Sequence, residues 1–180
     1  WFMLKMFGAH DVAILDGGIA KWKAEGRALA QGKETLRHRH FTVWQDDKDV
    51  RTKAQMLANL HSKAEQVLDA RGAKRFTGED SDPRPNIGAG HIPGSRNLPF
   101  TELYNADGTF KDKAALKAAF EAAGIDLAKP VVTTCGSGVT ASVLLFAMHL
   151  IGKDDTALYD GSWSEWGADP DTPKEEGAAA

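Results

Sequence analysis

The stretch VVTTCGSGVTASVLLFAMHL, residues 131–150, decides how the chain is expected to fold. Its first residues are mostly β-branched and predict a buried strand, while the apolar residues from Val143 onward repeat with helical spacing. Gly136, Ser137 and Gly138 lie between the two. A strand that enters a helix through two glycines leaves backbone N–H groups unpaired at the positive end of the helix dipole. The turn therefore predicts a cradle for an anion.

The only cysteine of the chain, Cys135, stands at the start of this turn. Donors that converge there would stabilise its thiolate, the form of a cysteine that acts as a nucleophile. Two alternatives stay open at this point. A lone cysteine is most often a small buried apolar residue, and a glycine-rich turn can hold a ligand's phosphate with the cysteine incidental. The strand-to-helix context favours the nucleophile.

Composition is that of an ordinary globular protein. The chain has 180 residues, 42% of them hydrophobic and 26% charged, which suffices for a domain with a real core. A net charge of −3 and the lack of a long apolar run predict neither nucleic acid nor a membrane as partner. A single cysteine cannot form a disulfide within the chain, so we expect a reducing compartment such as the cytoplasm.

Strand and helix patterns alternate along the second part of the chain. Helices are expected at 52–61, 112–123 and 143–151, strands at 67–70, 96–99, 131–134 and 157–159, and a long functional loop at 74–90. This order predicts an α/β fold with a parallel sheet flanked by helices, in which ligands bind beyond the carboxyl ends of the strands. Cys135 stands at such an end. The tail, residues 167–180, is expected to be frayed.

A spaced pattern recurs at an offset of 144 residues, the distance from Gly8 to Gly152. Five residues of the first copy, Gly8, Asp11, Asp16, Gly17 and Trp22, return as Gly152, Asp155, Asp160, Gly161 and Trp166. We interpret this as an internal duplication. Residues 1–23 are then the last helix (1–8), strand (12–15) and turn of a first domain, 24–50 are an interdomain linker, and 51–180 form a complete C-terminal domain.

The linker 24–50 is basic in its middle, at Arg37, His38, Arg39 and His40. No cysteine or carboxylate accompanies these histidines at the spacing of metal ligands, so we interpret the segment as solvated and expect no metal and no cofactor. Phe41, Val43 and Trp44 are the candidates for docking the linker onto the domains.

Arg75 and Arg84 lie in the loop at 74–90. Guanidinium groups bind carboxylates through two parallel hydrogen bonds, so the pair could hold a small acid near Cys135. From the residues alone the simpler alternative is that they pair on the surface with Glu79, Asp80 and Asp82.

Three further polar residues frame this loop. Asp69 and Arg71, near the end of the preceding strand, could support it by hydrogen bonds. His91 could act as a base, but its place before Ile-Pro-Gly is more typical of a structural turn residue.

Four motifs together resemble the catalytic half of a tandem rhodanese-type sulfurtransferase: LDARGAKRF (68–76), GHIPGSRNLPF (90–100), CGSGVTA (135–141) and YDGSW (159–163). The third is similar to the loop of 3-mercaptopyruvate sulfurtransferases in particular. The resemblance covers residues 51–167, and residues 1–23 resemble the end of the inactive first domain of such proteins.

The resemblance implies a function for each matching residue. Cys135 would take the sulfur of 3-mercaptopyruvate as a persulfide and release pyruvate, with Ser137 helping to move a proton. Arg75 and Arg84 would hold the carboxylate and keto oxygen of the substrate. The amide cradle would be formed by Gly136, Ser137, Gly138, Val139 and Thr140. Sulfur would then pass to cyanide or to an external thiol such as thioredoxin, because the chain has no second cysteine.

Three alternatives are weighed against this one. Thiosulfate, a dianion, is the donor where similar loops carry basic side chains, whereas this loop is neutral. A cysteine phosphatase needs an arginine six residues after its cysteine, where Ala141 stands, so that activity is disfavoured. A non-catalytic binding or sulfur-carrier module stays open. The resemblance also places first-domain residues opposite the active-site serine, so we expect weaker turnover from this chain than from an intact two-domain protein.

Overall fold

The computed structural model describes residues 1–33, 35 and 37–179. Its helices are α1 (Phe2–Met6), α2 (Gly18–Ala24), α3 (Lys53–Ser62), α4 (Ala73–Thr77), α5 (Lys113–Ala122), α6 (Ala141–Leu150) and α7 (Ser162–Trp166), with a 3₁₀ turn, η1, at Phe100–Leu103. Its strands are β1 (Val50–Arg51), β2 (Gln66–Asp69), β3 (Arg96–Asn97), β4 (Val131–Thr134) and β5 (Thr156–Tyr159).

The strands form one sheet in the order β1-β5-β4-β2-β3, and every neighbouring pair is parallel. The predicted α/β fold is thereby confirmed, and β1 is an edge strand that the sequence patterns did not indicate. β4 lies in the middle of the sheet with Thr134 in register with Asp69 of β2. The loops that follow β2 and β4 therefore leave the sheet at the same level, and Cys135 is the first residue beyond it.

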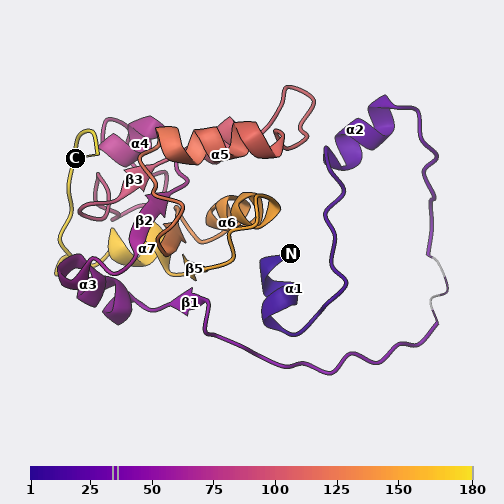
Figure 1. Ribbon diagram of the computed structural model, residues 1–180, viewed down its shortest axis with the longest axis horizontal. Coiled ribbons are helices and arrows are strands. Elements are labelled where there is room, and N and C mark those ends of the chain that lie inside the picture. The colour runs from indigo at the N-terminus through magenta and orange to yellow at the C-terminus, as the bar shows by residue number, and fades with distance from the viewer. Residues whose placement is uncertain (34, 36, 180) are drawn as a thin grey trace.

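Helices cover both faces of the sheet (Figure 1), so all four residues of β4 are buried. Successive strand residues point to opposite faces: Val131 packs in the core cluster with Phe120 and Leu144, and Val132 packs in the other with Met56 and Trp163. The turn after β4 is thus attached to the best-packed part of the molecule.

Local sequence explains the two longest predicted helices of the domain. The Thr52 side chain accepts the Gln55 N–H and the Gln55 side chain accepts the Thr52 N–H, which starts α3 with a capping box. The Asp112 carboxylate accepts the Ala115 N–H at 2.8 Å and starts α5. Both helices lie within about two residues of their predicted bounds.

The N-terminal segment contacts the domain through α1 and the residues just before α2. The Trp1 and Phe146 rings lie 5.1 Å apart in an edge-to-face arrangement, and the Phe110 N–H donates to the Asp16 carboxylate at 2.9 Å. In Figure 1 α1 lies beside α6, whereas α2 lies away from the sheet. Trp44 is 74% exposed.

Four predictions about single segments are wrong. The side chains of Phe41, Val43 and Trp44 are exposed and do not dock onto the domain. The segment is attached through its backbone instead, as in the hydrogen bond from the Trp44 N–H to the Phe7 carbonyl. Residues 12–15 do not form a strand. At the predicted offset they correspond to β5, which pairs with β1 and β4, and a strand needs such neighbours for its backbone groups.

The other two concern the predicted loop and tail. Residues 74–77 belong to α4 rather than to a loop, because buried Phe76 anchors a single helical turn. Over its described residues, 167–179, the tail is not frayed: the backbones of Glu175 and His91 exchange two hydrogen bonds, of 2.8 and 3.0 Å, and Thr172 is buried. Ala180 lies outside the described residues. Within the described residues no helix is long and apolar enough to cross a membrane.

Candidate active site

Cys135 lies at the floor of a turn with unused backbone donors. The residue is 1% exposed, and the Ser137 N–H points to its Sγ at 3.4 Å. In the part of the chain that the structure describes, the N–H groups of Gly136, Gly138, Val139 and Thr140 donate to no acceptor. These donors precede α6 and stand at its positive end, so the turn has the geometry to hold an anion against the sulfur.

The turn is held from behind by the residues that begin α7. The Ser162 hydroxyl accepts the Cys135 N–H at 3.2 Å and donates to the Tyr159 carbonyl at 2.8 Å. The Trp163 N–H donates to the Cys135 carbonyl at 2.9 Å. Ser162 is buried and has a φ of +51°, a backbone conformation that a non-glycine residue adopts only where its surroundings hold it. Sequence reasoning missed this support, although the motif YDGSW contains it.

A pocket of about 420 Å³ opens over the sulfur at the carboxyl edge of the sheet. Its lining comes from the turn, the loop after β2, α4, the long loop and η1: Ala70, Arg71, Gly72, Arg75, Pro83, Arg84, Phe100, Cys135, Gly136, Ser137, Val139 and Thr140. Seven of the eight predicted site residues are therefore in one pocket. Gly138 does not line it but supplies the backbone bend of the turn.

The two arginines reach the turn at Cys135 from different elements, Arg75 from α4 and Arg84 from the long loop that follows it. Arg84 Nη1 donates to the Gly136 carbonyl at 2.7 Å, and a side chain added at Gly136 would begin 3.2 Å from Arg84 and 3.4 Å from Arg75. Glycine at this position therefore leaves room for both guanidinium groups beside Cys135.

Both arginines also pair with one acid, Asp82. Arg75 Nη2 lies 2.5 Å from Oδ2, and Arg84 uses Nε and Nη2 in a fork at 2.8 and 3.0 Å. Of the three acids in the surface-pairing alternative, only Asp82 pairs with the arginines, and it does so away from the surface, since its side chain is only 2% exposed. Hydrogen bonds from Arg84, and then from Arg75, hold the pKa of Asp82 well below its usual range.

The pKa of Arg84 is shifted by the same pairing with Asp82. Its pKa is raised above the ordinary value, chiefly because Asp82 accepts its hydrogen bonds and, to a smaller extent, because of the charge of Cys135. Arg75 has a buried Nε with no hydrogen-bond partner among the described residues.

Asp69, Arg71 and His91 form the scaffold beneath the loop. Arg71 pairs with Asp69 at 2.7 Å and donates to the Gly90 carbonyl at 2.8 Å, which confirms the predicted support. The His91 ring stacks on Phe76 at 3.8 Å and its Nδ1 lies 2.9 Å from the Phe76 carbonyl oxygen. His91 is therefore a structural residue here, as its sequence context indicates.

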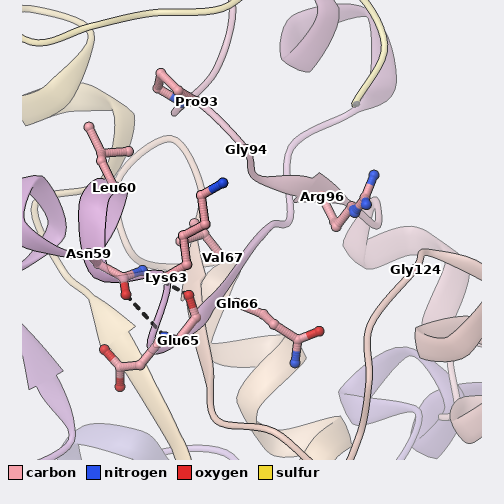
Figure 2. Close-up of a pocket in the computed structure, with 10 residues that line it drawn as sticks. All are labelled: Asn59, Leu60, Lys63, Glu65, Gln66, Val67, Pro93, Gly94, Arg96 and Gly124. Atoms are coloured by element: carbon pink, nitrogen blue, oxygen red, sulfur yellow. Dashed lines mark hydrogen bonds between the residues drawn. The ribbon is translucent and has the colours of Figure 1, made fainter.

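Another pocket, of about 380 Å³, opens at the opposite edge of the sheet, beside the amino end of β2 (Figure 2). Asn59 and Gln66, two of its polar side chains, are already hydrogen-bonded. Asn59 bonds the Glu65 backbone at 2.8 and 3.0 Å, and Gln66 Nε2 donates to the Asp126 carbonyl at 2.8 Å. No cysteine, serine or threonine lines it among the described residues, so the pocket over Cys135 is the candidate active site.

A substitution at Gly138 tests how closely the turn packs against Asp160. Its φ is +80°, and an added Cβ would lie 2.9 Å from the Asp160 carboxylate and 3.0 Å from the Asp160 carbonyl. We expect Gly138→Ala to lower the free energy of unfolding by about 2–3 kcal/mol, from backbone strain and close contact together. Gly152→Ala is the matched control, because Gly152 has a φ of +86° and no atom within 4 Å of its added Cβ. Equal losses in urea denaturation of the two variants would show that the contact with Asp160 is unimportant.

Comparison with known proteins agrees with this geometry. The family model of the rhodanese-like domain matches residues 52–169. The chain is 42% identical to the 3-mercaptopyruvate sulfurtransferase of Rattus norvegicus, over 92% of this chain and 56% of that protein. It is 38% identical to the thiosulfate sulfurtransferase of Cricetulus griseus, over 98% and 61%. The chain thus spans little more than half the length of these relatives.

A solved structure gives the same result. The crystal structure of SseA from Escherichia coli, a 3-mercaptopyruvate sulfotransferase, superposes with a TM-score of 0.79 at 38% identity, over 92% of this chain and 61% of that one. The parallel sheet, the turn after β4 and the match over residues 52–169 lead to one conclusion: the chain belongs to the rhodanese-like domain family.

Proposed function

We propose that this chain is a sulfurtransferase that moves the sulfur of 3-mercaptopyruvate to an acceptor through a persulfide on Cys135. One observation carries the proposal: a neutral turn surrounds the only thiol with free amide donors, and two arginines enter the same pocket. Relatives named for this activity add support. Because the chain spans only part of those relatives, its own activity has to be measured.

The proposed transfer needs no oxidant. The Cys135 thiolate attacks the thiol sulfur of 3-mercaptopyruvate, a sulfur–sulfur bond forms, and the carbon–sulfur bond breaks. The electron pair of the broken bond goes to the carbon next to the keto group as an enolate, which takes up the proton of the substrate thiol and becomes pyruvate. The Ser137 N–H, which points to the sulfur, and the other N–H groups of the turn would stabilise the anionic persulfide that remains.

The two arginines would orient the donor, with Arg75 and Arg84 holding its carboxylate and keto oxygen. Ser137 would pass the proton. Its hydroxyl is exposed in the turn and engages no partner within the described residues.

Thiosulfate is the second candidate donor, and the relative from Cricetulus griseus favours it. The turn itself argues against it, because Gly136, Ser137 and Gly138 offer dipoles but no positive charge to a dianion.

The lone cysteine requires an outside acceptor, so we propose cyanide or an external thiol such as thioredoxin. A thiol nucleophile works only when reduced, and we propose the cytoplasm as its compartment.

We also propose the domain division 1–23, 24–50 and 51–180, with the first part derived from the end of a preceding rhodanese-like domain. The backbone supports the duplication behind it. Gly8 and Gly152 have φ values of +90° and +86°, and Gly18 and Ser162 have +59° and +51°, each pair at the 144-residue offset. α2 and α7 begin at equivalent positions.

Steady-state kinetics with the two donors tests the proposed function. Pyruvate release from 3-mercaptopyruvate and sulfite release from thiosulfate are measured with the same acceptor. We expect a kcat/KM at least about tenfold higher for 3-mercaptopyruvate, because one unit charge near a pocket is worth about that factor. A higher value for thiosulfate would assign the chain to the second candidate, and no release from either donor would leave a non-catalytic module.

A further inference from the structure

Among the described residues, Asp82 is the one acid that contacts both Arg75 and Arg84. It accepts four hydrogen bonds from them: the Arg84 N–H, Nε and Nη2 at 3.0, 2.8 and 3.0 Å, and Arg75 Nη2 at 2.5 Å. Its side chain is 2% exposed, whereas those of the arginines are 32% and 34% exposed. The carboxylate therefore lies behind the guanidinium groups, where a ligand meets the arginines and not the acid.

We propose that Asp82 determines which donors the pocket accepts, by cancelling one of the two arginine charges so that a monoanion is favoured over a dianion. The proposal rests on the sulfurtransferase function and assigns a specificity-determining residue to it. Asp82 contacts no donor itself. It acts through Arg75 and Arg84.

The charges around the pocket can be summed from the contacts. Arg71, the third arginine of the lining, is paired with Asp69 at 2.7 Å and contributes nothing net. Arg75 and Arg84 share Asp82, so the three arginines of the lining and their two acid partners together contribute one positive charge to the pocket. Because hydrogen bonds from the arginines hold the pKa of Asp82 far below its usual range, this charge is constant at any pH where the enzyme would act.

Removing the Asp82 charge should change kcat/KM by a different factor for each donor, according to the charge of the donor. A second positive charge attracts a dianion twice as strongly as a monoanion at the same place, so the ratio of kcat/KM for thiosulfate to that for 3-mercaptopyruvate should rise about tenfold. Loss of arginine positioning would slow 3-mercaptopyruvate most, because the arginines are proposed to hold its carboxylate and keto oxygen, and it would raise the same ratio. The Val139→Lys variant described below leaves Asp82 and both arginines in place, so its ratio separates a charge effect from a merely structural one.

The experiment compares Asp82→Asn with Asp82→Glu. Asparagine removes the charge but keeps an oxygen acceptor of similar size, and we expect the donor ratio to rise about tenfold even if both rates fall. Glutamate keeps the charge, so its ratio should stay within about twofold of the parent value. An unchanged ratio in a folded Asp82→Asn variant, checked by circular dichroism, contradicts the proposal.

A variant at an exposed position of the pocket tests the charge effect without a substitution at the buried Asp82. Val139 lines the pocket and is 71% exposed, so Val139→Lys adds a positive charge with no buried group disturbed. We expect its donor ratio to rise about threefold, less than for Asp82→Asn because the charge sits at the rim. Val139→Gln is the neutral control. Equal ratios for the lysine and glutamine variants would contradict the charge mechanism.

An equilibrium measurement keeps this inference apart from the proposed function. The single cysteine gives a clean signal when neutral iodoacetamide alkylates it, and bound anions slow that reaction. We expect sulfate to protect Cys135 about tenfold better in Asp82→Asn than in the parent, relative to protection by pyruvate. This result with no sulfur transfer would overturn the function but keep Asp82 as the charge-setting residue. Sulfur transfer together with unchanged protection of Cys135 by sulfate would support the function but overturn the proposed role of Asp82.

Discussion

Replacing Cys135 with serine is expected to lower kcat/KM for 3-mercaptopyruvate by more than about 10³-fold, with pyruvate release falling to the uncatalysed rate. A serine hydroxyl stays protonated near neutral pH and forms no persulfide, so the sulfur has nowhere to go. The fold should tolerate the change, because the contacts of Cys135 to Ser162 and Trp163 are made by its backbone.

The measurement is pyruvate release with cyanide as acceptor, alongside thermal unfolding of the parent and the variant. Similar unfolding temperatures with lost activity support a chemical role for the thiol. Activity retained within about tenfold would mean that the sulfur passes by another route, and the assignment of Cys135 would be wrong.

Replacing Arg84 with lysine is expected to lower kcat/KM by about 10²-fold, although the positive charge is kept. Arg84 forms a fork with Asp82 and at the same time donates to the Gly136 carbonyl at 2.7 Å. An ammonium group cannot make planar paired contacts, so the substrate and the cysteine turn would both lose their alignment.

Arg51→Lys is the matched control for this variant. Arg51 makes the same kind of fork with Glu65, at 2.7 to 3.1 Å, but lies outside the pocket. Both variants should lose similar stability in urea, while only Arg84→Lys loses catalytic efficiency. Parallel losses of activity in the two would show that the fork serves folding alone.

The features predicted well from sequence are those whose signal is local. The turn at Cys135 was predictable because a β-branched strand, two glycines and an apolar helix follow each other directly, and α5 carries its own cap at Asp112. The parallel sheet followed from the alternation of these local patterns. The resemblance to the sulfurtransferase family predicted that Arg75 and Arg84 lie near Cys135, and both line the pocket over it.

What sequence reasoning missed depends on partners far away in the chain. Residues 12–15 read as a strand, but a strand exists only beside neighbours that pair with it. The tail gave no sign of its backbone contact with His91. Asp82 was one of three acids near the arginines, and only folding shows that it alone is buried between them.

Intact-mass spectrometry after brief exposure to 3-mercaptopyruvate, without an acceptor, tests the central claim most directly. The account predicts that the parent protein gains the mass of one sulfur atom, that cyanide removes it, and that Cys135→Ser gains nothing. No added mass at any donor concentration, or equal addition to the variant, would contradict sulfur transfer through Cys135.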